Sequence, residues 1–281
     1  MELAKLVSEL TTLKRETDAV LNMLKSIAAL EQNRTKNIPQ IKIRLKKVRE
    51  AWNKVETDES PRRHLPAWAD EYAKQLTATQ EKEKSKFGMV LERLLAGQGI
   101  QLSGQYPSLK AGLFTIDLDF DRWQARIWYG PKQELLAKCN STSVEVADFM
   151  REVQQGLGSG IQEKELLARL HDAYLALLSG RLGEPVPIIR LLGVLQKTLH
   201  QRASDSETRT GAPHPYRRVD FSFDLFRLRQ ADTVDFNGMR LGLIVATRAF
   251  TRKRQDFLWV PDDASGKGTT YSHLQFREVL S

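Results

Sequence analysis

Cysteine is almost absent from this sequence, which has one cysteine among 281 residues. The single Cys139 excludes an internal disulfide and a metal site built from several thiolates. The five histidines show no metal-ligand spacing, and no catalytic base is evident for Cys139. The sequence therefore predicts no cofactor, and it gives no support to thiol catalysis.

Long apolar runs are also missing. The best run, residues 241–246, is far shorter than the roughly 20 residues that cross a bilayer. Glu2, Lys5 and Glu9 interrupt the leucines of the N-terminal segment, which therefore does not resemble a secretion signal. These features predict a cytoplasmic protein that has no membrane partner.

Acidic residues are too few to balance the lysines and arginines, and the formal net charge is +8. The excess is +6 in residues 1–110, −1 in residues 111–215 and +3 in residues 216–281. A basic excess favours phosphate backbones through counterion release, although it also keeps a protein soluble. The charge distribution therefore indicates nucleic acid as a partner without requiring it.

The first third of the chain, residues 1–97, is predicted to be a helical arm. Breaks are expected at residues 37–39, because a residue before proline disfavours helix, and at residues 58–61; a third helix should begin near Pro66 and end near Ala96. Apolar residues at alternating steps of three and four form two seams: Leu3, Leu6, Leu10, Leu13, Val20, Leu24 and Ile27, then Ile38, Ile41, Leu45, Val48, Trp52 and Val55. A seam this narrow is typical of coiled coils. It predicts either association of residues 1–57 with a second copy or another protein, or a hairpin arm, and a three-helix domain is the alternative.

The second seam is accompanied by a basic cluster in which Glu50 is the only acidic residue. Its members are Lys36, Lys42, Arg44, Lys46, Lys47, Arg49 and Lys54. Those inside the helix lie off the apolar seam, so they should crowd its solvent side. Like charges three or four residues apart repel by a few tenths of a kcal/mol per pair, so helix stability alone does not explain them. The cluster predicts a phosphate-binding ridge, and a solvated helix face is the alternative.

Residues 98–281 are predicted to be a mixed α+β domain of antiparallel strands. It contains a helical segment at about 143–202 and a mobile loop at about 203–215, and residues 98–112 read as a connecting loop. We expect the N-caps of two helices at residues 141–143 and at Ser159, with Val144 on a buried face. Predicted strands are residues 114–120, 123–129, 133–139 and 219–225, a hairpin about Asn237-Gly238, and residues 257–260 paired with 241–245.

A second basic cluster, Arg248, Arg252, Lys253 and Arg254, should form the tip of a hairpin. Phe250, Phe257 and Trp259 lie near it in the sequence. Such a tip could hold phosphates and stack a base. Exposed turns are also often basic for solubility alone, so both interpretations stay open.

Asp117, Asp119 and Asp121 alternate with apolar residues, so they share one face of a predicted strand. Asp117 and Asp119 could bind a divalent cation in a nuclease or nucleotidyltransferase, with Asp220 or Asp224 as a third ligand. The Gly-Ser turn of a nucleotidyltransferase is missing, and residues 265–270 do not fit a Walker loop. We therefore favour a solvated sheet face. Its carboxylates would pair with arginines on other strands, the candidates being Arg122, Arg126, Arg227 and Arg229.

Together these features predict an α+β protein with an N-terminal helical or coiled-coil arm and a mixed C-terminal domain. The expected function is a non-catalytic subunit of a multi-protein assembly that binds the backbone of DNA or RNA. One alternative is a metal-dependent nuclease or nucleotidyltransferase that uses Asp117 and Asp119. The other is a scaffold that contacts an acidic protein.

Overall fold

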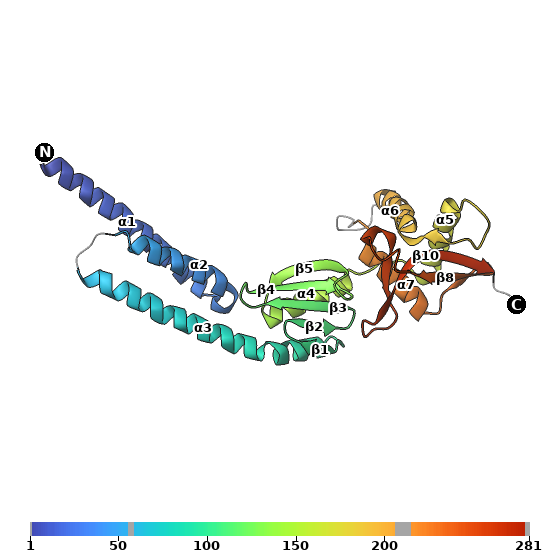
Figure 1. Ribbon diagram of the computed structural model, residues 1–281, viewed down its shortest axis with the longest axis horizontal. Helices are drawn as coiled ribbons and strands as arrows, with labels where there is room; N and C mark the ends of the chain where they lie inside the picture. The colour runs from blue at the N-terminus through green and yellow to red at the C-terminus, as the bar shows by residue number, and fades with distance from the viewer. Residues whose placement is uncertain (1, 56–58, 206–214, 279–281) are drawn as a thin grey trace. The chain divides into compact units, whose positions relative to one another are not determined.

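The computed structural model describes residues 2–55, 59–205 and 215–278 (Figure 1). The fold is mixed α+β, and N-terminal helices precede two antiparallel sheets, which confirms the predicted class. Within the described residues, no helix combines the length and apolarity that crossing a bilayer requires. The chain divides into two compact units. One comprises Met1–Leu94, Leu118–Ala125 and Cys139–Ala147, and the other Leu95–Asp117, Arg126–Lys138 and Asp148–Ser281.

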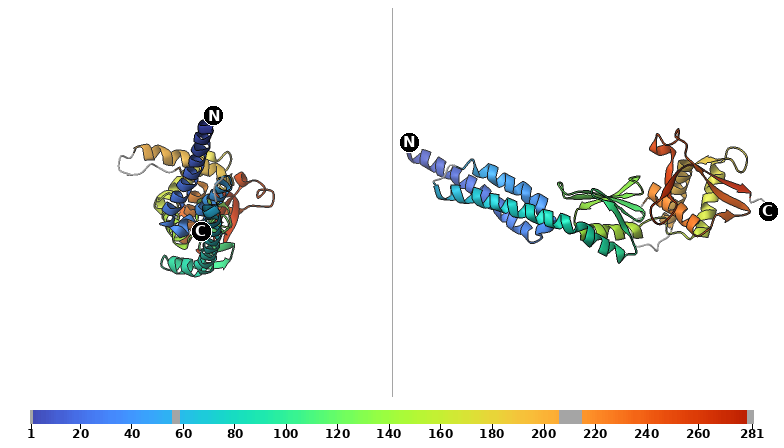
Figure 2. Two further views of the ribbon diagram at one scale, coloured as in Figure 1. Left: turned by 90° about the vertical axis from the view of Figure 1, so that its left-hand side faces the viewer. Right: turned by 60° about the horizontal axis from the view of Figure 1, so that its bottom comes forward.

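The first unit is built on a helical hairpin. Helices α1 (Glu2–Glu31) and α2 (Arg34–Trp52) lie side by side, and α3 (Glu59–Ala96) runs along them (Figure 2). The seam of α2 is buried in this arrangement, as are two residues of α1: the buried set is Val20, Ile27, Ile38, Ile41, Leu45, Val48 and Trp52. The second seam therefore packs within the chain itself. The side chains of Leu3, Leu6, Leu10 and Leu13 lie outside the described residues, so association through residues 1–57 stays a prediction.

The first helix break lies earlier than the sequence suggested. Helix α1 ends at Glu31, and Pro39 lies inside α2. The turn before α2 is closed by Asn37, whose side-chain amide donates to the Leu30 carbonyl at 3.0 Å. Pro39 is early in α2 and removes one helical hydrogen bond, which the burial of Ile38 and Ile41 offsets. Helix α3 likewise begins at Glu59, before Pro66.

Helix α3 is fixed to the turn after strand β3 (Phe114–Asp119) and to the start of helix α4 (Ser143–Gln155). The Phe120 ring meets the Phe87 ring edge to face, with centroids 5.3 Å apart. The Gln80 side-chain amide donates to the Phe120 carbonyl at 2.5 Å, and the Ser143 hydroxyl donates to the Phe87 carbonyl at 3.2 Å. All of these contacts lie within the first unit. They fix the stretch of α3 that faces α2.

The first sheet runs in the order β1-β2-β3-β4-β5. The strands are β1 (Leu102–Gln105), β2 (Ser108–Ala111), β3 (Phe114–Asp119), β4 (Gln124–Tyr129) and β5 (Glu134–Asn140). The three strands predicted over residues 114–139 are confirmed. Residues 98–112 are not the predicted loop, because β1 and β2 pair there and bury Leu109 and Ala111. Glycine and proline are common in loops, but here Gly104 belongs to β1 and Pro107 lies in the turn between β1 and β2.

Helix α4 (Ser143–Gln155) follows the sheet and begins at the predicted cap. The Thr142 hydroxyl accepts the backbone N–H of Glu145 at 3.4 Å, as an N-cap does. The prediction for Val144 is wrong, because its side chain is 60% exposed while Val146 and Ala147 are buried. The rest of the helix has its apolar face buried as the pattern predicts, including Ala147 and Met150.

The second sheet has the order β6-β10-β8-β7, and β9 also pairs with β10. Its strands are β6 (Val186–Pro187), β7 (Asp235–Phe236), β8 (Met239–Val245), β9 (Leu258–Pro261) and β10 (Gly268–Glu278). The Asn237-Gly238 turn is confirmed: both residues have positive φ, 50° and 74°, and they join β7 to β8. The predicted pairing of residues 257–260 with 241–245 is wrong. The long strand β10 pairs with both segments instead.

Helices α5 (Glu163–Leu177) and α6 (Ile188–Asp205) pack on each other and against β10, and both help form the core of the second unit. The predicted helical segment is therefore present as α4, α5 and α6. Residues 203–205 of the predicted mobile loop end α6, and residues 206–214 lie outside the described part of the chain.

Residues 219–225 were predicted to form a strand but lie in helix α7 (Arg218–Gln230). The alternation of apolar and polar residues misled the prediction because this helix is buried on several sides. Asp220, Ser222 and Asp224 are as buried as their apolar neighbours. The predicted Ser159 cap is also wrong: Gln162 precedes α5, and the backbone N–H of Ser159 donates to Asp224 at 3.0 Å.

Candidate nucleic-acid interface

The basic residues of α2 fall into two groups, and the first group is engaged by the chain's own side chains. The Lys42 ammonium donates to the Gln80 side-chain oxygen at 2.5 Å, and the Arg49 guanidinium binds the Asp70 carboxylate at 2.6 Å. Lys46 lies 3.8 Å from Glu50, one turn further along α2. Lys36, near the start of α2, lies 3.7 Å from Glu145. Most of the predicted ridge therefore has internal partners, and Lys42 and Arg49 are held by α3.

The second group consists of Arg44, Lys47 and Lys54, which we call the open stripe. Among the described residues, none of the three forms an ion pair within 4 Å. Lys47 and Lys54 are exposed, and Arg44 is partly buried. Steps of three and seven residues place all three on one side of a helix. Lys54 follows α2, but its N–H donates to the Ala51 carbonyl at 3.1 Å, so the helical turn continues to it.

The second basic cluster occupies the connection between β8 and β9, and we call residues 248–254 the basic loop. Because β8 and β9 do not pair with each other, this connection is not the hairpin tip that the sequence suggested. Its turn is ordered by backbone bonds from the N–H groups of Phe250 and Thr251 to the Thr247 carbonyl, at 2.9 and 3.2 Å. Arg248, Arg252 and Lys253 are exposed. No ion pair within 4 Å involves these three in the part of the chain that the structure describes.

Arg254 differs from the other cations of the basic loop. Its guanidinium binds one oxygen of Glu134 at 2.8 Å, and Arg218 of α7 binds the other oxygen at 2.8 Å. Arg218 also donates to the Phe257 carbonyl at 2.7 Å. Glu134 therefore bridges two arginines and ties the end of the loop to β5 and α7.

The three aromatic residues predicted to lie beside this cluster have different environments. Trp259 is only 5% exposed, and its ring meets Tyr129 edge to face at 5.2 Å. Phe257 is partly buried. Phe250 is 40% exposed, and its ring meets His273 of β10 at 5.1 Å. Of the three, Phe250 alone offers substantial surface to a ligand.

The aspartates near the end of β3 have cationic partners. Asp117 lies 2.8 Å from the Lys132 ammonium, and Asp119 accepts the Arg122 backbone N–H at 3.0 Å with the guanidinium at 3.7 Å. Asp121 is exposed. The described residues contain no group of three or more His, Cys, Asp or Glu side chains placed to hold a metal ion. Of the arginines predicted as partners, Arg122 binds this row, whereas Arg227 and Arg229 bind carboxylates elsewhere.

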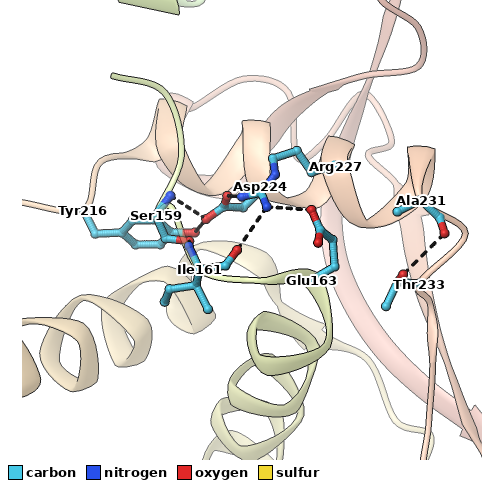
Figure 3. A network of polar contacts seen from close by, with 8 residues as sticks. All are labelled: Ser159, Ile161, Glu163, Tyr216, Asp224, Arg227, Ala231 and Thr233. Carbon is cyan, nitrogen blue, oxygen red and sulfur yellow. Dashed lines mark hydrogen bonds and ion pairs between the residues drawn. The ribbon is translucent and has the colours of Figure 1, made fainter. Parts of the chain in front are cut away.

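The carboxylates of α7 belong to a buried polar network that the sequence did not reveal, and Figure 3 shows the part around Asp224. Asp224 accepts hydrogen bonds from the Tyr216 hydroxyl at 2.9 Å, the Ser159 backbone N–H at 3.0 Å and Arg227 at 3.1 Å. Arg227 also donates to the Ile161 carbonyl and to Glu163, at 3.0 and 2.6 Å. Burial raises the pKa of Asp224 above its ordinary value, although these donors oppose that rise.

Asp220, one turn before Asp224, is held in the same way. Its two oxygens accept hydrogen bonds from the Arg217 backbone N–H at 2.8 Å, the Arg217 side chain at 3.0 and 3.1 Å, and the Gly158 backbone N–H at 3.3 Å. Asp220 and Asp224 therefore anchor residues 158–163 to α7. With their oxygens occupied in this way, neither offers a free ligand to a metal site. The three-residue spacings of Arg217 and Asp220 and of Asp224 and Arg227 are the local signals that could have suggested the network.

Comparisons with models of known protein families, with curated proteins and with solved structures find no match. The distribution of charge on the described surface is therefore the main evidence for function. It separates engaged cations, such as Lys42, Arg49 and Arg254, from the cations of the open stripe and the basic loop.

Proposed function

We propose that this protein is a non-catalytic nucleic-acid-binding subunit of a larger assembly. The open stripe and the exposed cations of the basic loop would bind the sugar–phosphate backbone. The observation that carries the proposal is the difference within α2. Lys46 and Arg49 are paired with the carboxylates of Glu50 and Asp70, whereas Arg44, Lys47 and Lys54 have no ion pair among the described residues. Positive charge that the fold does not neutralise attracts counterions, and phosphate binding releases them with a gain in free energy.

The dimensions of the open stripe suit a polyanion. Arg44 and Lys54 are ten residues apart, which corresponds to about 15 Å along a helix at 1.5 Å per residue. A DNA duplex carries one negative charge per ~1.7 Å of its axis, so about nine charges fall within this length. Contacts of this kind bind the backbone and carry no sequence information.

The assembly part of the proposal rests on the apolar surface of the helical hairpin. Leu21 of α1 is 47% exposed and Ile43 of α2 is 58% exposed, although both helices bury other apolar residues. Ile43 directly precedes Arg44 in the sequence. A second copy or another protein that covers these side chains would lie beside the open stripe and could bind the same nucleic acid.

The decisive variant reverses the open stripe: Arg44→Glu, Lys47→Glu and Lys54→Glu together. Fluorescence anisotropy with a labelled 20-nucleotide duplex and its single strand, at several salt concentrations, measures the affinity. Three lost phosphate contacts should lower the affinity at least tenfold. They should also reduce the slope of log K against log [salt] by about 2 to 3. Circular dichroism should show unchanged helicity.

A matched control carries the same change in charge at exposed positions of the second unit: Lys164→Glu, Arg181→Glu and Arg190→Glu. This control should keep most of the affinity. Equal losses in the two triple variants would show that only net charge matters and would refute the assigned surface. Failure of the wild-type protein to bind either polynucleotide would refute the function itself and favour a protein scaffold.

A further inference from the structure

The basic loop combines an exposed aromatic ring with several uncompensated charges. Phe250 lies two residues after Arg248 and two residues before Arg252, and Lys253 follows. All four side chains are exposed. None of the three cations forms an ion pair with another described residue. At 40% exposure the Phe250 ring forgoes part of the roughly 2 kcal/mol that full burial would contribute, and it leaves apolar surface for a ligand beside the cations.

The ring of Phe250 is held in place while it remains accessible. Its one aromatic contact among the described residues is with His273, which it meets edge to face at an interplanar angle of 89°. His273 belongs to β10, which pairs with both β8 and β9, and is thus part of the sheet. Burial lowers the pKa of His273 below its ordinary value, which favours the neutral imidazole.

The backbone of the loop is also ordered. Besides the two bonds to the Thr247 carbonyl, the Thr251 hydroxyl donates to the Arg248 carbonyl at 3.2 Å. The turn therefore places Phe250 among the cations before any ligand arrives. Because the backbone of this loop is already ordered, it would lose little conformational entropy when a ligand binds.

We infer that the basic loop binds single-stranded nucleic acid, with one unpaired base stacked on Phe250 and the flanking phosphates held by Arg248, Arg252 and Lys253. This inference rests on the proposed function and names the form of nucleic acid that the loop prefers. A duplex stacks its base faces on one another, so it can offer only its backbone to the loop. A single strand offers a base face and phosphates together, which is the combination that stacking platforms use.

The test compares the full-length protein with its Phe250→Leu and Phe250→Trp variants. Anisotropy measures their binding to a labelled 20-nucleotide single strand of mixed sequence and to the duplex of the same sequence. Stacking one base contributes about 1 to 3 kcal/mol, so Phe250→Leu should weaken single-strand binding about tenfold. It should change duplex binding less than twofold. Phe250→Trp keeps an aromatic face and should retain the wild-type preference for the single strand.

The outcomes distinguish this inference from the proposed function. The stacking site would be overturned if Phe250→Leu left salt-dependent binding unchanged, or if it weakened binding equally for the single strand and the duplex. Either result would leave backbone binding intact. The absence of binding to either ligand by the wild-type protein would overturn both. Loss of binding in Phe250→Trp as well as in Phe250→Leu would show that the residue acts through packing on His273, and this too would contradict the stacking site.

Discussion

Helices α2 and α7 both carry conspicuous charges, but the acidic residues of α7 and the open stripe of α2 have opposite environments. On α7, Asp220 and Asp224 are almost fully buried, and each accepts hydrogen bonds from arginine and from backbone N–H groups. On α2, Arg44 is partly buried and Lys47 is exposed, and neither forms an ion pair with a described residue. A charge that folding requires is thus surrounded by partners, and a charge without partners is available to a ligand.

The physical basis of this difference is the cost of desolvation. A buried carboxylate loses several kcal/mol of hydration, and only several donors can compensate for that loss. An exposed lysine or arginine keeps its hydration, so the fold has no need to neutralise it. Variants in the two helices should therefore change different properties: stability for α7 and binding for α2.

The largest effect on stability is expected for Asp224→Ala. The change leaves the Tyr216 hydroxyl and the Ser159 N–H without an acceptor, while Arg227 keeps Glu163; two buried donors left unsatisfied, at about 1 to 3 kcal/mol each, cost about 2 to 6 kcal/mol. Urea denaturation followed by tryptophan fluorescence should show a loss of about that size. Asp148→Ala, which removes an exposed partner of Arg151, is the control and should cost less than about 1 kcal/mol. Similar losses in the two variants would contradict the role given to the buried network.

A smaller effect, with a control of opposite sign, is expected at a glycine beside this network. Gly158 has φ +82°, and a Cβ atom there would lie 2.7 Å from the Asp224 side-chain oxygen. Gly158→Ala should therefore destabilise the protein by about 2 kcal/mol in the same denaturation experiment. Gly193 lies inside α6, and a Cβ atom there would meet no atom within 4 Å. Gly193→Ala should stabilise the protein by about 0.5 to 1 kcal/mol, and the same sign for both substitutions would refute the packing described for residue 158.

The sequence predicted those parts of the fold that local signals determine. Alternation about Asp117 and Asp119 located β3, and Asn237-Gly238 located the turn before β8, because positive φ at both positions favours this pair. The heptad steps of Ile41, Leu45 and Val48 located the buried side of α2.

The side-chain contacts that the sequence did not reveal are made with residues that are distant along the chain. Lys42 binds Gln80, 38 residues away, and Arg218 binds Glu134, 84 residues away. No pattern within a helix predicts which of its cations such partners will engage. Helix α7 was mistaken for a strand for the same reason, because its polar residues find buried partners in residues 158–159 and 216–217.

The most direct test of the account is a matched comparison on α2. One double variant, Arg44→Gln with Lys47→Gln, neutralises two cations of the open stripe, and the other, Lys46→Gln with Arg49→Gln, neutralises two cations that are already paired with carboxylates. Each pair removes one lysine and one arginine from the same helix, so net charge is equal. We predict that the slope of log K against log [salt] for single-stranded and duplex oligonucleotides falls by about 2 in the first variant and hardly changes in the second. Equal slopes in the two variants, or the larger change in the second, would contradict the claim that the unpaired cations bind phosphate.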